Sequence, residues 1–506
     1  MKKLLILLAA MTLVFGAVSQ AGAAVKFGAT GNWQHQFTYQ HNVPNFNSDL
    51  EQDNLFMYNR ANITFTVEAN EYIKANTLVR IGAFDWGNGH SVQPTAAATN
   101  AYGGTMASRT GLEVRQAFIS VKFPGVPVTL DTGVMPLALP AAALGSNPVL
   151  NDRLPAIVLG FPVGDVGKAA LVYSRPYRTA PGTSKDFAKY NSIDAIAALA
   201  DLNFGNFGLA PYLAYVKAGH KATITGGSGV NRGYYTLYND DNNTTAIIGG
   251  AAFKISPVEN LSIGLDAIYG ATSSSDSKND TTLPIPAADG SKDVKASGFL
   301  VGLSVDYKMD FGTPGAFCWY GSGLKKSDTD DGKYGVLPLI GPDGGIQKMR
   351  FATHSPRVVT ATDSQVAGRN GVGTMGIGVQ LANVKSMDKL THTFRLGYIK
   401  GTGDKDANYL TNSGGYNRAG TLSGNNGGLA DLNGMSKDYS LIEFDIENTF
   451  KIVDNLELKA DFGILAPNVK NKDDHKVSAP ANALKNNGDL ATDTGFALDL
   501  VLQYNF

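Results

Sequence analysis

Hydrophobic and polar residues alternate along most of the chain, in segments of about 9–15 residues, the length of tilted strands that cross a bilayer. In a β-strand, successive side chains point to opposite faces, so each segment presents one apolar and one polar face. The last segment shows this most clearly. Every second residue from Phe496 to Phe506 is Phe, Leu or Tyr, whereas Asp499 and Gln503 lie on the other side. A final strand that ends on Tyr504 and Phe506 is typical of the closing strand of a transmembrane β-barrel.

The polar faces of these segments carry mostly Thr, Asn, Gln, Ser, Lys and Asp. This pattern predicts a barrel with lipid outside and a water-filled lumen inside. Aromatic residues fall near the ends of several segments, among them Trp319, Tyr398, Tyr439 and Tyr504. We expect these aromatic side chains to form girdles at the two membrane interfaces.

Connections between the segments alternate between short and long. Short ones include 69–71 and 453–455, and long ones include 40–53, 325–371 and 401–437. Outer-membrane barrels sort their connections in this way, into short periplasmic turns and long external loops. The alternation gives seventeen clear segments and an ambiguous one at 154–161. Because both termini should be periplasmic, the strand number should be even, and we predict eighteen strands, with sixteen as the alternative.

The first residues predict export. Lys2 and Lys3 precede an apolar run from Leu4 to Val18, and small residues follow up to Ala24. This is the pattern of a signal peptide, so we expect residues 1–24 to be removed and residues 25–506 to form a single barrel domain. No later apolar run is long enough for a spanning helix. The single cysteine, Cys318, excludes an intramolecular disulfide.

The sequence offers little support for an enzyme, a cofactor or a nucleic-acid partner. The 43 basic and 44 acidic residues nearly balance, which argues against nucleic-acid binding. The Gly-rich run 371–376 continues into a predicted strand and not into a helix that would bind a phosphate. Residues 328–332 lack the ligand spacing of a calcium loop, and the histidines lack metal-ligand spacing. We therefore expect no reaction, no cofactor and no metal site.

Several motifs in the first 180 residues, taken in order, resemble the general bacterial outer-membrane porins. They are Tyr58-Asn-Arg60, Arg115-Gln-Ala-Phe-Ile-Ser-Val-Lys-Phe123, Val128-Thr-Leu-Asp-Thr-Gly133, a loop of about twenty residues at 135–154, and the segment 152–161. Within that superfamily, the chain looks closest to the homotrimeric porins of anaerobic sulfate-reducing bacteria. The resemblance implies that the loop at about 135–154 folds inward and narrows the pore. It also implies a homotrimer in the outer membrane of a Gram-negative bacterium.

The same resemblance implies that Arg60, Arg115 and Arg153 are wall arginines that face acidic residues on the inward loop. Side-chain parity independently predicts that Arg60 and Arg80 face the lumen. Arg115 shares its parity with outward-facing apolar residues, so parity and resemblance disagree there. Either a β-bulge or packing against a neighbouring subunit would reconcile them.

The predicted narrowing loop departs from the family because residues 136–150 contain no acid, and Asp152 is the only carboxylate nearby. Glu443, Asp445 and Glu447 share the inward face of another predicted strand and form a second candidate acidic wall. We therefore expect a pore that is nearly neutral or weakly anion-preferring.

These observations predict an outer-membrane porin that allows passive diffusion of small hydrophilic solutes and ions. A substrate-selective channel, for example for sugars, is the closest alternative, and an outer-membrane enzyme or adhesin is a more remote one. The expected partners are membrane lipids and lipopolysaccharide, further copies of the chain, and the barrel assembly machinery, which would read Tyr504 and Phe506.

Overall fold

The computed structural model describes residues 25–43, 46–50, 53–85, 112–178, 192–218, 244–274, 295–327, 333–340, 345–353, 371–404, 408–410, 416–418, 435–470 and 492–506. Eighteen long antiparallel strands form the main sheet. They are β1 (Lys26–His41), β2 (Asp53–Glu68), β3 (Ile73–Asp85), β4 (Leu112–Lys122), β5 (Thr129–Ala138), β6 (Asn151–Val163), β7 (Gly167–Arg178), β8 (Ser192–Asn203), β9 (Phe207–Ala218), β10 (Thr244–Ile255), β11 (Leu261–Ser274), β12 (Lys295–Tyr307), β13 (Thr313–Gly321), β15 (Thr374–Met387), β16 (Leu390–Gly401), β19 (Tyr439–Val453), β20 (Leu456–Val469) and β21 (Gly495–Asn505).

Four short elements lie outside this set of eighteen. They are the 3-10 helix η1 (Ser48–Leu50) and the strands β14 (Lys333–Tyr334), β17 (Asn408–Leu410) and β18 (Tyr416–Arg418). The predicted signal peptide, residues 1–24, lies outside the described residues and remains a prediction.

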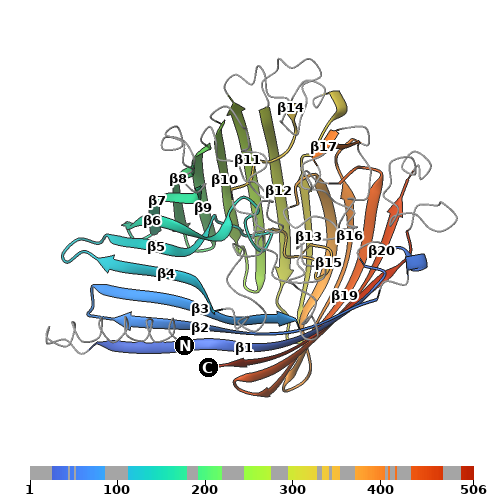
Figure 1. Cartoon of the computed structure of the whole chain (residues 1–506), viewed down its shortest axis with the longest axis horizontal. Helices are drawn as coiled ribbons and strands as arrows, with labels where there is room; N and C mark the ends of the chain where they lie inside the picture. The colour runs from blue at the N-terminus through green and yellow to red at the C-terminus, as the bar shows by residue number, and fades with distance from the viewer. Residues whose placement is uncertain are drawn as a thin grey trace, which may run out of the picture.

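The sheet closes on itself, because each long strand pairs with its sequence neighbour and β21 returns to pair with β1 (Figure 1). At the closing seam, Trp33 lies opposite Tyr504. The backbone of Gly31 exchanges two hydrogen bonds with Phe506, at 2.7 and 3.0 Å. The predicted all-β barrel is therefore confirmed, with eighteen strands and not sixteen.

The two faces of the barrel wall differ in the way that the alternation predicted. On β12, Phe299, Val301 and Leu303 are exposed on the outer face, and the residues between them are buried inside. Exposed large apolar side chains lie on the outer faces of strands around the barrel. Exposing such an apolar surface to water would be unfavourable, so the outer wall is suited to contact with hydrocarbon. Among the described residues, no helix is both long and apolar enough to span a membrane.

Connections at one end of the barrel are short, such as 164–166 between β6 and β7 and Asp454–Asn455 between β19 and β20. We call this the short-turn end and the other the long-loop end. Asn260 adopts φ 69° in the turn before β11, and Gly125 adopts φ 73° in the turn before β5. Asn and Gly tolerate this left-handed conformation better than other residues, which permits such tight reversals.

The lumen differs from the polar, water-filled space that the sequence predicted. Much of it contains a hydrophobic core, which includes Leu300, Phe317 and Trp319 from the wall and Ile346 and Phe351 from a connection. Two of the predicted girdle residues belong to this interior. Trp319 points inward and donates from Nε1 to the hydroxyl of Thr374 at 3.1 Å, and Tyr439 is 2% exposed. The prediction failed at these two residues because strand-end position does not specify which face an aromatic side chain occupies.

Candidate functional site

Two connections enter the barrel and lie against its inner wall. The first strap, residues 139–150, joins β5 to β6, and the second strap, residues 345–353, belongs to the connection between β13 and β15. Most apolar side chains of both segments are buried, among them Leu144, Val149, Ile346 and Phe351. The sequence predicted that the first segment would fold inward, but it assigned the second to an external loop.

A single wall carboxylate holds the first strap. Asp266 on β11 is 2% exposed and accepts backbone N–H groups from Ala142 at 2.7 Å, Ala143 at 2.8 Å and Leu144 at 2.9 Å. Hydrogen bonds to a charged acceptor are stronger than neutral ones, and this carboxylate would be costly to bury without them. The Leu144 side chain packs against the wall at Gly302, where any side chain would collide with it.

Two wall carboxylates on β19 hold the second strap in the same manner. Glu443 accepts the N–H groups of Phe351 at 2.7 Å and Ala352 at 2.8 Å, and Asp445 accepts the N–H of Arg350 at 2.9 Å. Both carboxylates are fully buried. These two acids therefore position a lumen segment and do not form an open acidic wall.

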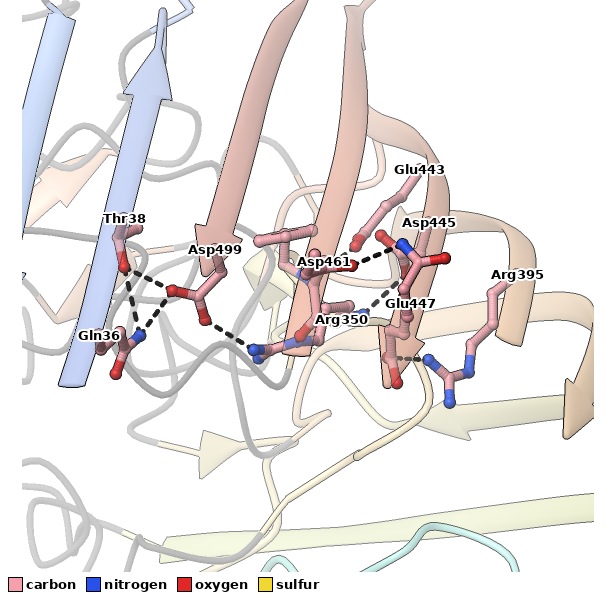
Figure 2. A network of polar contacts seen from close by, with 12 residues as sticks. Gln36, Thr38, Arg350, Arg395, Glu443, Asp445, Glu447, Asp461 and Asp499 are labelled. Atoms are coloured by element: carbon pink, nitrogen blue, oxygen red, sulfur yellow. Dashed lines mark hydrogen bonds and ion pairs between the residues drawn. The ribbon is translucent and has the colours of Figure 1, made fainter. Parts of the chain in front are cut away.

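Arg350 extends from the second strap toward two neighbouring strands, β20 and β21 (Figure 2). Its Nε donates to Asp461 on β20 and its Nη2 donates to Asp499 on β21, both at 2.8 Å. Asp499 also accepts hydrogen bonds from Gln36 at 2.7 Å and Thr38 at 2.6 Å on β1. The two carboxylates raise the pKa of Arg350 against the opposing effect of burial, so the guanidinium stays charged.

The two straps are bonded to each other. The N–H of Gln347 donates to the carbonyl of Leu144 at 2.8 Å. Before the second strap, on the same connection, the N–H of Ile340 donates to the carbonyl of Val149 at 2.9 Å. Ser146 and Gly345 exchange two further hydrogen bonds, at 2.8 and 3.0 Å. The straps thus form one body that extends from Asp266 on β11 to the acids of β19–β21.

Beside the second strap, a polar cavity of about 380 Å³ remains open in the lumen. Its lining comes from the wall and from the strap, and it carries four cations and three carboxylates. The charged lining residues are Arg60, Arg350, Arg395, Lys459, Glu447, Asp461 and Asp499. By formal charge, this lining has one net positive charge.

Arg60 lies in this cavity, as its parity predicted. Its Nε donates to the Gln34 side chain at 2.6 Å. Arg80 also faces inward, and its Nε donates to Asn62 at 3.0 Å, while Glu113 lies 3.8 Å away. Arg80 does not line the cavity.

Arg115 faces inward because β4 contains a bulge. The register of β4 against β3 shifts between Val114 and Gln116, which leaves Arg115 as the extra residue. Leu112 and Val114 face outward before the bulge, and Ala117 and Ile119 face outward after it, so Arg115 and Gln116 both point inward. Arg115 Nη1 lies 3.4 Å from Glu113. The conflict between parity and resemblance is thus resolved by the bulge.

Arg153 does not join the other arginines. On β6 it shares the outward parity of Pro155 and Ile157, both of which are exposed. Asp152, on the inward parity, accepts the backbone N–H of Arg153 at 2.6 Å. The structure therefore places Arg153 on the outer side of the wall and Asp152 at the base of the first strap, outside the cavity lining.

The third residue of the predicted acidic wall behaves differently from Glu443 and Asp445. Glu447 lines the cavity and forms an ion pair with Arg395 on β16. Arg395 lies directly opposite Asp445 in the strand register, and Glu447 lies directly opposite Asp461 on β20.

Sequence reasoning missed the residues that position the straps, namely Arg350 and Asp266. One available signal was the apolar run 336–340 inside a connection that was taken to be external. A second was the accumulation of inward acids on β19, β20 and β21, which requires buried donors or cations. Among the described residues, no group of His, Cys, Asp and Glu has the arrangement of a metal site.

Comparison with known proteins supports the fold. No protein-family model and no curated protein matches the sequence. Among solved structures, the chain is similar to OccAB3 of Acinetobacter baumannii, with a TM-score of 0.50, 11% identity, and coverage of 95% of this chain and 99% of that one. It is also similar to the outer membrane protein OprD of Pseudomonas aeruginosa, with a TM-score of 0.49, 11% identity, and coverage of 94% and 93%. The similarity to OccAB3 extends over nearly the whole of both chains and shows that they share a barrel fold.

Proposed function

We propose that this chain is an outer-membrane porin that allows passive diffusion of small hydrophilic solutes and ions. The observation that carries the proposal is a closed eighteen-strand barrel with an apolar exterior and a charged cavity left open beside the straps. A barrel of this size is wide enough for an aqueous channel. The overall similarity to a solved outer membrane protein agrees with this location.

The proposed mechanism needs no reaction and no energy source. Solutes pass where the straps leave the lumen open, and wall charges act on them at close range in a confined space. Arg60, Arg350, Arg395 and Lys459 face Glu447, Asp461 and Asp499 there. Because four cations oppose three acids, we expect weak anion preference. In this proposal Arg80 and Arg115 add positive charge near the path, and Glu443 and Asp445 act only through the strap.

A substrate-selective channel is the second candidate. Two straps, not one, narrow the lumen, and the remaining cavity offers hydrogen-bonding groups from Gln34, Gln347 and Gln503. Such a lining favours solutes that exchange several hydrogen bonds with it over solutes that merely fit. Saturable block of ion current by one solute class would support this candidate over a general porin.

Four further features belong to the proposal and not to the structure. We propose that the chain is exported by its first 24 residues and that the short-turn end is periplasmic. We also propose that the protein assembles as a homotrimer among lipopolysaccharide and phospholipid. The terminal residues Tyr504 and Phe506 would be read by the barrel assembly machinery before β21 closes on β1.

Conductance of the purified protein in planar bilayers tests the proposal. We expect discrete current steps, and a reversal potential in a potassium chloride gradient that indicates weak anion preference. The matched control is the same protein unfolded before addition, in the same detergent. Absence of steps from folded protein would contradict the porin function, and clear cation preference would contradict the proposed role of the arginines.

A further inference from the structure

Cations on the outer wall are sorted to one end of the barrel. Arg175, Lys217, Lys295 and Lys400, which we call the rim cations, all have outward parity and lie within a few residues of the long-loop ends of β7, β9, β12 and β16. Arg153, half-buried, has the same parity and lies at the same end of β6. The rim cations are separated by two or three strands, or roughly 10–15 Å.

The short-turn end shows the opposite arrangement. Its strand lysines are exposed, but they have inward parity and so lie on the side away from the apolar outer wall. The residues directly before two of them, Phe253 and Phe450, have outward parity. Examples are Lys122, Lys254, Lys385 and Lys451. Among described side chains, therefore, lysine and arginine face outward only at the long-loop end. A random scatter of surface charge would not sort by both end and face.

Each rim cation lies beyond an exposed, outward-facing aromatic residue on its own strand. Tyr173-Ser-Arg175, Tyr215-Val-Lys217 and Tyr398-Ile-Lys400 repeat one spacing, and Lys295 lies four residues from Phe299. Aromatic side chains mark the boundary between hydrocarbon and head groups. A cation two residues further along a tilted strand lies about 5 Å farther out, at the depth of lipid phosphates.

The site on β7 and β8 is the most organised part of this rim. Asp194 accepts hydrogen bonds from Arg175 Nε and the Tyr173 hydroxyl, both at 2.7 Å, and from the Ser192 hydroxyl at 2.6 Å. These contacts fix the orientation of the guanidinium on the outer wall, where it is 44% exposed. Among the strand residues that the structure describes, two outward carboxylates, Asp194 and Asp53, lie at this end, against the four rim cations.

We propose that the rim cations bind the phosphate groups of a phosphorylated glycolipid in the external leaflet, namely lipopolysaccharide through its lipid A part. Glycolipid phosphates at this depth match an outward belt of cations, and the lack of such a belt at the other end matches a leaflet of a different composition. The inference rests on the proposed outer-membrane location and not on the transport function.

Lipid binding by the full-length folded protein tests the proposal. Lipid A with two phosphates is titrated onto the protein in non-ionic detergent, and bound copies are counted by native mass spectrometry. We expect the variant R175Q/K217Q/K295Q/K400Q to bind at least about tenfold more weakly than wild type, since each cation near a charged lipid surface contributes appreciably. The matched control K122Q/K254Q/K385Q/K451Q removes the same charge from the short-turn end and should bind as wild type does.

Two further arms separate the sources of phosphate. Lipid A with its phosphates removed should bind wild type no more tightly than intact lipid A binds the rim variant. Phosphatidylglycerol should not displace lipid A from wild type at equal concentration. Equal binding of lipid A with and without phosphates, equal loss in both variants, or efficient displacement by phosphatidylglycerol would each overturn the proposal. Pore conductance should be unchanged in the rim variant, so failure here is distinct from failure of the porin function.

Discussion

The two straps are held by the same device but differ in what they bring to the lumen. Asp266 accepts three backbone N–H groups from the first strap, and Glu443 with Asp445 accepts three from the second. The first strap carries no charged side chain, whereas the second carries Lys348 and Arg350. The comparison indicates that one segment mainly restricts the width of the path and the other also sets its charge.

Asp266→Ala should have the largest effect on pore width. It removes the acceptor of three buried N–H groups, at a cost of roughly 3 kcal/mol or more. We expect the first strap to leave the wall and single-channel conductance to rise. The measurement is conductance in planar bilayers at fixed salt. The control is Asp201→Ala, which removes an exposed carboxylate at the short-turn end. Equal conductance in wild type and Asp266→Ala would show that the first strap does not limit the current.

Glu443→Ala should have a smaller effect of the same kind. It leaves two N–H groups unpaired, at a cost of roughly 2 kcal/mol or more, while Asp445 and the Arg350 ion pairs still hold the strap. We expect a rise in conductance that is less than for Asp266→Ala, together with more current noise from strap movement. Glu443→Gln keeps one acceptor oxygen and should lie between Glu443→Ala and wild type. A larger rise than for Asp266→Ala would reverse the proposed ranking of the straps.

Arg350→Gln tests the charge difference between the straps. The substitution leaves Asp461 and Asp499 without their shared cation beside the open cavity. We expect the anion-to-cation permeability ratio, measured from reversal potentials, to fall at least about twofold. Arg350→Lys retains the charge and should change the ratio less. An unchanged ratio in Arg350→Gln would show that ions do not pass near this side chain.

Lys348 provides the smallest expected effect, a dependence of selectivity on pH. Burial lowers its pKa, with Asp306 opposing the shift, so the lysine loses its charge at a lower pH than an exposed lysine would. As pH rises toward about 10, the ordinary value for lysine, anion preference should weaken. Lys348→Met should remove this part of the pH dependence while leaving the rest of the profile in place. A wild-type profile identical to that of Lys348→Met would contradict the assignment.

Much of the wall was predictable from sequence, and much of the lumen was not. Alternation in β12 or β21 specifies two faces because only one face can contact hydrocarbon, and this rule also placed Arg60. The inward direction of Arg115 depends on the bulge in β4, which changes the parity of the strand without any local sequence signal. The second strap was missed because its partners, Glu443 and Asp499, lie about a hundred residues or more away along the chain, and alternation describes only a strand and its immediate environment.

We infer that water and ions pass beside the second strap, along the wall that carries Gln503, while the first strap covers the opposite wall. In a Cys318→Ser background, single cysteines at Gln503 and Ser304 can be reacted with a charged thiol reagent during current recording. Gln503 lines the open cavity, and Ser304 is 4% exposed beneath the first strap. We predict that modification lowers conductance in Gln503→Cys and leaves the conductance of Ser304→Cys unchanged. Block through Ser304→Cys with none through Gln503→Cys would show that ions pass along the wall beneath the first strap instead.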